Sequence, residues 1–342
     1  MNAPMSEHTQ HTIVLAAHTP ALFQAAVNRA AELLRAGEVV ALPTETVYGL
    51  AANALNPTAV RRIYEIKQRP IHNPIIVHVS DGAMARNCVA EWPELANQLA
   101  ASFWPGPLTL VLPRAKSIPD EVTAGGETVG VRAPSHPLMQ AVIRACGFPL
   151  AAPSANLANE LSPTNAEHVL RSLGSRIALI VDGGQSQVGI ESTVLDISVS
   201  PPRVLRPGMI HEESLVAVVG DLQRGPAEGG ALRSPGLLKR HYSPKARLLI
   251  HAWSSDDELN KLTAEFASQG KVFVIAHTHI PAQGRFASVS VIPHDPEAFA
   301  RAIYSELHLC DAEGADTIVV ERVPDEPSWR GIADRLQRAA AL

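Results

Sequence analysis

The chain has 342 residues, of which 46% are hydrophobic and 18% are charged, and its net charge is −5 at pH 7. This composition supports a buried core and excludes a disordered protein, while the length predicts two domains. No apolar run reaches the roughly 18 residues that a membrane span requires, and residues 1–11 do not resemble a signal peptide. Three widely spaced cysteines form neither a disulfide framework nor a metal motif, so we expect a cytoplasmic protein.

The charge is distributed unevenly along the chain. Residues 247–342 hold 9 basic and 14 acidic side chains, whereas residues 1–210 are close to neutral. A negative net charge creates no global field that attracts nucleic acid, so stable direct binding of nucleic acid is not expected. The asymmetry predicts a boundary between two domains, with room for a local cationic cleft in the first.

Helical and strand patterns alternate over the first two hundred residues. Apolar residues at helical spacing predict helices over 20–36, 58–68, 95–103 and 137–145. Short apolar or β-branched runs predict strands over 39–42, 75–79, 108–112, 128–132, 150–152, 178–181 and 192–197. This interleaving predicts an α/β fold around a sheet of mixed pairing.

The pattern then stops and restarts. Residues 221–236 are rich in glycine and proline without hydrophobic periodicity, which is typical of a linker or a covering loop. Beyond Lys245, strands are predicted over 247–252, 271–276 and 317–321, and helices over 256–268 and 299–310. A second, smaller α/β domain fits this alternation.

The most informative segment is residues 43–50, with the sequence PTETVYGL, which follows the predicted strand 39–42. Ligands bind at the carboxyl ends of strands in open α/β sheets, so hydroxyl groups at this position indicate a binding site. The next helix then delivers Lys67 and Arg69 directly before the stop at Pro70. Two cations beside a strand end that carries hydroxyls predict a site for a phosphate or a carboxylate.

Three cations, Lys67, Arg69 and Arg132, lie next to apolar stretches in which an isolated buried charge would be costly. The sequence around them offers few carboxylates, so we expect a bound anion to satisfy them. A structural interpretation exists for each residue on its own. Thr44 and Thr46 could form a turn, His78 could be a core histidine, and Arg132 could pair with a structural carboxylate.

No pair of carboxylates suggests a general acid and base, and no serine, histidine and aspartate combination has a recognisable spacing. Glu191 is the best single candidate, although a helix-capping role fits it equally well. The chemistry therefore looks like the positioning of charged reactants, as in nucleotidyl transfer with Mg²⁺ supplied together with ATP. No metal site of the protein itself is indicated.

Several motifs occur in a definite order along the chain. They are residues 43–50, Lys67-x-Arg69-Pro70, Asn73-Pro74, 104–109 (WPGPLT), 131–134 (VRAP), 153–156 (PSAN), 191–194 (ESTV) and 205–208 (LRPG). Over roughly residues 20–210 this series closely resembles threonylcarbamoyl-AMP synthase, the YrdC-like family. Residues 234–236 (SPG) and 241–244 (HYSP) further resemble the linker of its two-domain form.

The resemblance implies a division into a catalytic domain over 15–210, a linker or lid over 211–246, and an accessory domain over 247–342 that resembles a Rossmann fold. It implies a twisted mixed sheet with a concave cationic cavity. It also implies a reaction in which L-threonine, bicarbonate (or CO₂) and ATP give threonylcarbamoyl-AMP and pyrophosphate. A separate transferase would then move the threonylcarbamoyl group to tRNA.

Site residues are implied by position in the same way. Threonine would contact Thr46, His78, Arg132 and Ser192, and ATP would contact Arg69, Asn73, Thr128, Ser154, Ser162, Arg206 and Tyr242. Lys67 and Arg69 would be the catalytic cations, and Tyr242 would close over the nucleotide to exclude water. The base that deprotonates the threonine amine is not identified.

Four positions depart from the usual pattern of the family, and none removes a proposed ligand: they are Ala51, Gln68, the pair Ala158-Asn159, and Lys239.

Three other functions are also considered. An RNA-binding module without turnover would need an extended basic stripe, which is missing. Hydrogenase-maturation proteins contain a similar domain beside zinc-finger and acylphosphatase-like segments, neither of which is visible here. A regulatory protein that binds threonine or nucleotide would lack turnover.

Overall fold

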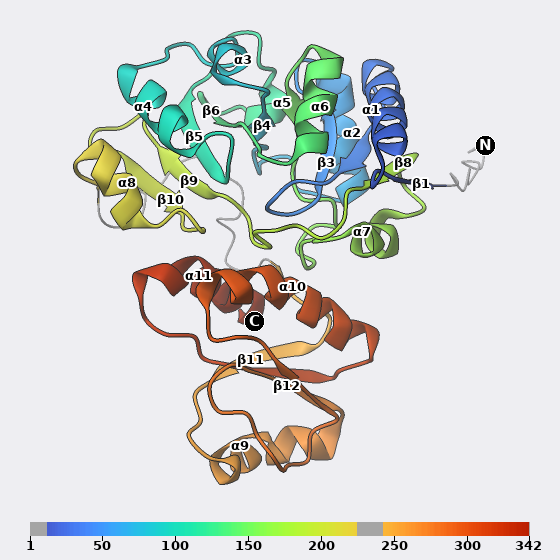
Figure 1. Ribbon diagram of the computed structural model, residues 1–342, viewed down its shortest axis with the longest axis vertical. Helices are drawn as coiled ribbons and strands as arrows, with labels where there is room; N and C mark the ends of the chain where they lie inside the picture. Colours follow the sequence, from blue (N-terminus) through green and yellow to red (C-terminus); the bar gives the residue numbers. More distant parts are fainter. Residues whose placement is uncertain (1–11, 224–241, 342) are drawn as a thin grey trace, which may run out of the picture.

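The computed structural model describes residues 12–223 and 242–341, which form two α/β domains (Figure 1). The N-terminal domain, for which the resemblance implies the catalytic role, contains a ten-stranded sheet of order β1-β8-β2-β3-β7-β4-β6-β5-β9-β10, and the C-terminal domain a four-stranded sheet of order β11-β14-β12-β13. The predicted α/β class and mixed pairing are confirmed. None of the helices in the described ranges is long and apolar enough to cross a membrane.

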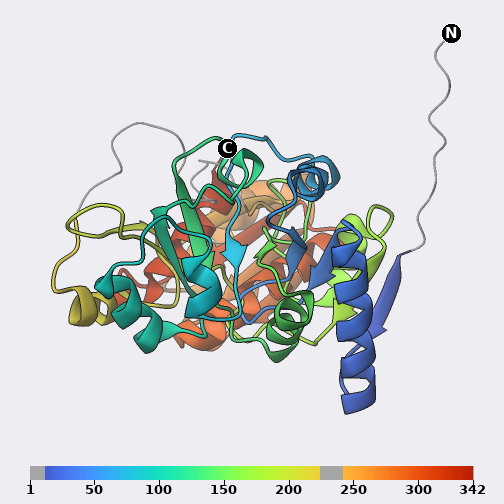
Figure 2. The same ribbon diagram turned by 90° about the horizontal axis from the view of Figure 1, so that it is seen from above.

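The strands of the larger sheet are β1 (Ile13–Ala16), β2 (Val40–Leu42), β3 (Gly49–Asn53), β4 (Val77–His78), β5 (Leu108–Pro113), β6 (Thr128–Arg132), β7 (Leu150–Ala151), β8 (Leu179–Asp182), β9 (Thr193–Asp196) and β10 (Arg203–Arg206). The helices of this part are α1 (Pro20–Arg35), α2 (Pro57–Lys67), α3 (Gly82–Arg86), α4 (Glu94–Phe103), α5 (Asp120–Thr123), α6 (Pro137–Cys146), α7 (Ala166–Leu173) and α8 (Glu212–Val219). Figure 2 shows α1 at the margin of the domain, next to the edge strand β1.

Local sequence signals set the ends of the two helices that come before the site. The side chain of Thr19 accepts a hydrogen bond from the backbone of Leu22 and so caps α1, and Asn56 caps α2 in the same manner. Helix α2 ends at Gln68, which takes the left-handed conformation with φ of 52°. This turn brings Arg69 back under the helix and toward the sheet.

Pairing within the larger sheet brings distant polar residues together. Strands β4 and β6 are parallel, so His78 lies opposite Arg132, while β7 runs antiparallel to β4. Strand β5 pairs in parallel with β9, which places Ser192, the residue before β9, close to Thr109. Mixed pairing therefore brings side chains that are far apart within residues 40–206 close together in space.

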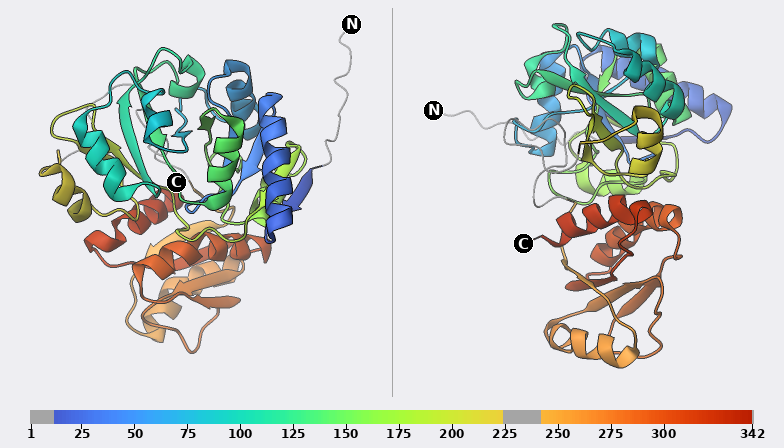
Figure 3. Two further views of the ribbon diagram at one scale, coloured as in Figure 1. Left: turned by 45° about the horizontal axis from the view of Figure 1, so that its top comes forward. Right: turned by 90° about the vertical axis from the view of Figure 1, so that its left-hand side faces the viewer.

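The C-terminal domain consists of the parallel strands β11 (Arg247–His251), β12 (Val272–Ala276), β13 (Ser288–Val291) and β14 (Thr317–Glu321), with helices α9 (Asp256–Gln269), α10 (Pro296–Ala312) and α11 (Arg330–Ala340). Helices α10 and α11 lie between its sheet and the catalytic domain, and α9 lies on the opposite face (Figures 1 and 3). Two helices thus form its contact with the site.

Very close backbone contacts join the two domains. A Cβ atom on Gly189 would lie 2.3 Å from the carbonyl oxygen of Ala300 in α10, and one on Gly331 in α11 would lie 2.9 Å from the Cα atom of Gly208. Only glycine fits such positions, and Gly189 also has a φ of 84°. The C-terminal domain is therefore docked directly on the loops that precede β9 and follow β10.

Some elements were not predicted. The sequence patterns missed β1, β3, α3, α5, α7, β10, α8, β13 and α11. Helix α8 lies within the expected linker 211–246 and contacts α4, so the start of that segment is helical. The expected linker or lid also covers residues 224–241, including Lys239, which lie outside the described residues.

Candidate active site

A pocket with a volume of about 50 Å³ lies in the N-terminal domain, with Tyr242 in its wall. It is lined by eight of the twelve residues predicted for the site: Thr46, Arg69, His78, Arg132, Ser154, Ser192, Arg206 and Tyr242. Glu191 lines it as well. His78, Arg132 and Arg206 are the last residues of β4, β6 and β10, and Ser192 directly precedes β9. The pocket therefore lies at strand ends, as the sequence had suggested.

Arg132 is fixed by three groups of the protein. Its Nη2 forms a 2.7 Å ion pair with Glu45, its Nη1 donates to Thr46 Oγ1 at 2.9 Å, and its Nε donates to the carbonyl of Gly106 at 3.3 Å. The side chains of Arg132 and Glu45 are only 4% and 8% exposed. The expectation that Arg132 needs a bound anion for lack of a carboxylate was therefore wrong, because Glu45 supplies one.

The hydroxyl groups after β2 form a compact turn around this arginine. Thr44 Oγ1 lies 2.9 Å from Thr46 Oγ1 and donates to the carbonyl of Val47 at 2.6 Å. The predicted turn-forming role of the two threonines is thus present, together with the predicted place in the pocket. The two threonines therefore form the turn and also lie in the pocket wall.

His78 is buried beside Arg132, and its Nδ1 has no hydrogen-bond partner among the described residues. Burial, followed by the nearby charge of Arg132, lowers the pKa of His78 to about 3. The imidazole is therefore neutral at neutral pH. A neutral ring at the pocket wall can accept or donate a hydrogen bond without adding charge.

Lys67 is fully buried but does not line the pocket. Its Nζ donates to the carbonyls of Ser154 and Asn156 and lies 3.3 Å from Asn156 Oδ1. Burial, and then the charge of Arg69, hold the pKa of Lys67 well below its usual value. In this structure Lys67 therefore holds the loop that carries Ser154 in the pocket.

Arg69 lines the pocket and anchors the segment that follows it. Its Nη2 donates to the carbonyl of Pro74 at 3.0 Å and its Nε to that of Asn73 at 3.3 Å. Burial lowers the pKa of Arg69 to about 10, so the group stays cationic at neutral pH. Asn73 itself is buried next to the pocket, and its Oδ1 has no hydrogen-bond partner among the described residues.

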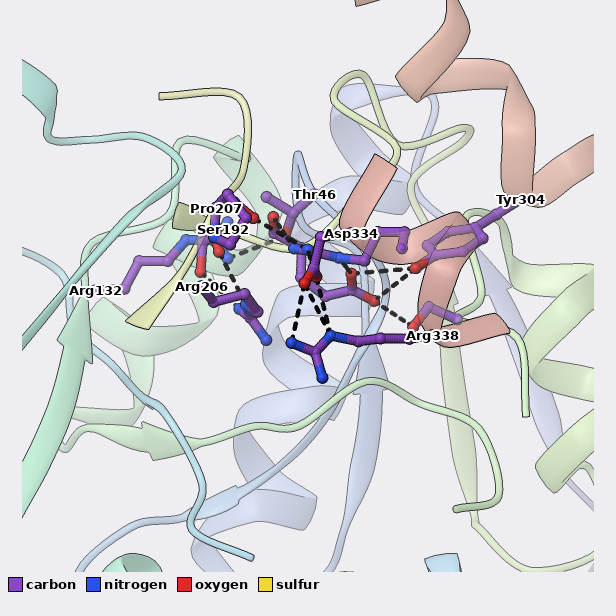
Figure 4. Close-up of polar contacts among 11 residues, drawn as sticks. Thr46, Arg132, Ser192, Arg206, Pro207, Tyr304, Asp334 and Arg338 are labelled. Atoms are coloured by element: carbon purple, nitrogen blue, oxygen red, sulfur yellow. Dashed lines mark hydrogen bonds and ion pairs between the residues drawn. The ribbon is translucent and has the colours of Figure 1, made fainter. Parts of the chain in front are cut away.

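Arg206 and Ser192 form the opposite wall. Arg206 donates from Nε to the carbonyl of Ser192 at 3.1 Å and from Nη2 to its hydroxyl at 3.2 Å. That hydroxyl lies 2.8 Å from Thr109 Oγ1. Burial lowers the pKa of Arg206 below its usual value, while interaction with Tyr242 opposes this effect. Figure 4 shows Ser192, Arg206 and Pro207 close together.

Glu191 links this wall to the C-terminal domain. Its Oε2 is bound by Arg335 Nε at 2.6 Å and by the Tyr304 hydroxyl at 3.2 Å, and its Oε1 accepts from Ser162 at 2.5 Å. Burial raises the pKa of Glu191, but Arg335, Arg206 and the hydrogen bonds together lower it below its usual value. Ser162 thus contacts Glu191 and does not line the pocket.

Sequence patterns did not reveal three of these residues: Glu45, Tyr304 and Arg335. The helical spacing of Ile332, Leu336 and Ala339 could have revealed α11. It could not have shown that Arg335 in this helix pairs with Glu191. Thr128 lies at the start of β6 and lines a different, smaller cavity with Thr109 and Gly130. Within residues 12–223 and 242–341 there is no group of three or more metal-ligating side chains.

Comparisons with known proteins agree on one family. A family model described as telomere recombination matches residues 32–208, and one described as the C-terminal domain of threonylcarbamoyl-AMP synthase matches residues 210–341. The chain is 42% identical to threonylcarbamoyl-AMP synthase of Bacillus subtilis over 328 residues, covering 92% of each chain. It is 39% identical to that of Pyrococcus abyssi over 322 residues, covering 92% of this chain and 94% of the relative.

The fold gives the same result. The crystal structure of P. abyssi Sua5 complexed with L-threonine superposes with a TM-score of 0.89 at 36% identity, covering 96% of this chain and 98% of that one. Similarity at this level extends over both domains and across the interface between them. The chain therefore belongs to the threonylcarbamoyl-AMP synthase family, in its two-domain form.

Proposed function

We propose that this enzyme carries out the reaction of its family in the pocket described above, with L-threonine, bicarbonate or CO₂, and ATP as substrates. The convergence of Arg69, Arg132 and Arg206 on one small pocket supports the assignment most directly. Guanidinium groups suit the carboxylate of threonine and the phosphates of ATP, because each can donate two parallel hydrogen bonds. The cavity would thus be cationic where the substrates are anionic.

Threonine would bind on the side of Arg132. The contacts with Glu45, Thr46 and Gly106 fix the plane of the guanidinium, so its remaining N–H groups are preorganised for a carboxylate. Thr46, neutral His78 and Ser192 offer hydrogen bonds to the amine and the hydroxyl of threonine. The bound amino acid in the P. abyssi relative supports this choice of substrate.

ATP would bind on the side of Arg69 and Arg206, with Ser154 at the pocket wall and Tyr242 over it. Asn73 and Ser162 do not line the pocket, but Asn73 accepts a hydrogen bond from Arg69 and Ser162 donates one to Glu191. Thr128 would contact ATP only if a part of the nucleotide extends along β6. Mg²⁺ would enter with ATP and neutralise phosphate charge. The donor groups in the described residues provide no separate cage for it.

The reaction would begin when the neutral threonine amine attacks CO₂ and releases a proton, or attacks bicarbonate and releases water, and so forms N-carboxythreonine. Its new carboxylate attacks the α-phosphorus of ATP in line, and pyrophosphate leaves. Arg69 and Arg206 would stabilise charge on the phosphoryl oxygens. Water must be excluded because the carbamate and the mixed anhydride both hydrolyse. The position of Tyr242 in the pocket wall favours that exclusion.

The product would be consumed by a separate transferase that modifies tRNA, so the enzyme itself needs no stable contact with nucleic acid. The test is pyrophosphate release by the purified enzyme with ATP and Mg²⁺, with threonine or bicarbonate omitted in turn. Release that requires both substrates is the expected result. Release without either would contradict the proposal, as would tight tRNA binding without any release.

A further inference from the structure

The contact between the domains ends inside the pocket wall and not at the protein surface. Arg335 is 1% exposed and its partner Glu191 is 8% exposed. Besides the ion pair, Arg335 donates from Nη2 to the backbone carbonyl of Glu191 at 3.1 Å and from Nη1 to that of Pro207 at 3.0 Å. One side chain of α11 thus holds the residue before Ser192 and the residue after Arg206.

Two further groups complete this cluster. The Tyr304 hydroxyl from α10 approaches both oxygens of Glu191, at 3.2 and 3.5 Å. The guanidinium of Arg335 also lies over the ring of Tyr242, 5.5 Å from its centre. Figure 4 shows Tyr304, Asp334 and Arg338 of the C-terminal domain on one side of this cluster and Ser192 and Arg206 on the other.

Glu191 lies between two arginines with different tasks. Both Arg335 and Arg206 act on its charge, and the effect of Arg335 is the larger of the two. Arg206 lines the pocket, whereas Arg335 lies outside it. Without Arg335, Arg206 would be the remaining cation among the described residues that acts on the Glu191 carboxylate. Because an uncompensated buried charge is costly, the carboxylate would then attract Arg206 more strongly.

We propose that Arg335, with Tyr304, is a positioning residue of the C-terminal domain that binds Glu191 and so keeps Arg206 directed at the nucleotide. The carboxylate of Glu191 would otherwise draw Arg206 out of the pocket. This role rests on the proposed function of Arg206 in ATP binding. It gives the C-terminal domain a direct part in nucleotide affinity, beyond stabilising the fold.

The test is a double-mutant cycle on the full-length enzyme with steady-state pyrophosphate release as readout. Arg335→Met is expected to raise the KM for ATP by roughly tenfold or more, with a smaller effect on the KM for threonine. Adding Glu191→Gln to Arg335→Met removes the carboxylate that captures Arg206. It is expected to bring the KM for ATP back to within about threefold of the wild type.

A purely structural role of Arg335 would not produce this rescue, since the double variant lacks the same contact between the domains. Arg330→Ala is the matched control. It removes a 2.7 Å ion pair with Glu212 that also joins the domains but lies on the surface. Its kinetic constants should match those of the wild type. An unchanged KM for ATP in Arg335→Met, or a raised KM that Glu191→Gln does not relieve, would overturn the proposal.

If Arg335→Met fails to fold, Arg335→Gln replaces it, because glutamine can still donate to the carbonyls of Glu191 or Pro207 but carries no charge for the Glu191 carboxylate. The same rescue by Glu191→Gln is expected, and its absence would again count against the proposal. Failure of the wild type to release pyrophosphate in response to threonine and bicarbonate is a separate outcome. It would refute the proposed function and not the positioning role alone.

Discussion

Two buried arginine–glutamate pairs border the same pocket, and they are built in different ways. Arg132 and Glu45 both belong to the catalytic domain, and Arg132 is further held by Thr46 and a backbone carbonyl. The pair of Arg335 and Glu191 spans two domains and depends on the docking of α10 and α11. On the proposed assignments, substrate affinity is set within the catalytic domain on one side of the pocket and by the interface on the other.

The largest effect is expected from Arg132→Ala. Loss of a preorganised donor at the reacting site costs on the order of a hundredfold or more in turnover. The buried carboxylate of Glu45 would also lose its partner, which destabilises the fold by about 3–5 kcal/mol. Pyrophosphate release and chemical unfolding measure the two effects separately.

The control for this change is Arg132→Ala combined with Glu45→Gln. Stability should recover in the double variant, because no buried charge is left alone, whereas activity should stay low. Recovery of both would mean that Arg132 serves only as the partner of Glu45. In that case the comparison between the two pairs would lose its functional meaning.

Gly189→Ala tests the interface side of the comparison. The new Cβ atom would lie 2.3 Å from the backbone of α10 in a residue with a φ of 84°, so we expect a loss of about 3 kcal/mol in stability. Gly147→Ala is the control, since its backbone is left-handed with a φ of 76° but a Cβ atom there meets nothing within 4 Å. It should cost only about 1 kcal/mol. Equal shifts in urea midpoint for the two variants would contradict the role of close docking.

A smaller effect is expected from pH at His78, next to Arg132. Its pKa of about 3 in the folded protein lies below the usual value of 6.5, so the unfolded chain binds more protons between these two values. Stability is therefore complete above pH 6.5 and falls as the pH drops through this window, by about 2 kcal/mol at pH 5.

His78→Gln should remove this part of the pH dependence, so that its melting temperature falls less between pH 7 and pH 5 than that of the wild type. His72→Gln is the control, because the side chain of His72 is exposed. Identical slopes in the wild type and His78→Gln would show that His78 is not held neutral by its surroundings.

The smallest effect is expected from Arg330→Ala. The ion pair with Glu212 joins the domains, but its side chains are 49% and 44% exposed, so it should contribute less than about 1 kcal/mol. If Arg330→Ala lowers the free energy of unfolding as much as Arg335→Met does, burial does not distinguish the two contacts between the domains.

The sequence allowed prediction of the elements with strong periodicity. Helices α1, α2, α4 and α6 occur within one or two residues of the expected positions, and so do most strands of the larger sheet. Strand β3 was missed because Gly49–Asn53 contains small residues and no β-branched side chain. Strand β1 lies at the sheet edge and is paired only with β8, which offers no buried run to recognise.

For the site, sequence reasoning identified the wall residues but not their supports. Motif order placed Thr46, Arg132 and Ser192 together, and all three line one pocket. Glu45 stands inside the most informative motif, yet the sequence does not show that its side chain turns toward Arg132. Arg335 was out of reach for another reason, because its partner lies 144 positions away and in another domain.

That separation has a consequence for the order in which the protein is made. Translation produces Glu191 long before Arg335, so a nascent chain with a folded catalytic domain holds Glu191 without its final counterion. Only when α11 is complete and docked can the nucleotide side of the pocket take its final arrangement. On the positioning role proposed for Arg335, a product truncated before this residue would carry every residue of the pocket and bind ATP weakly.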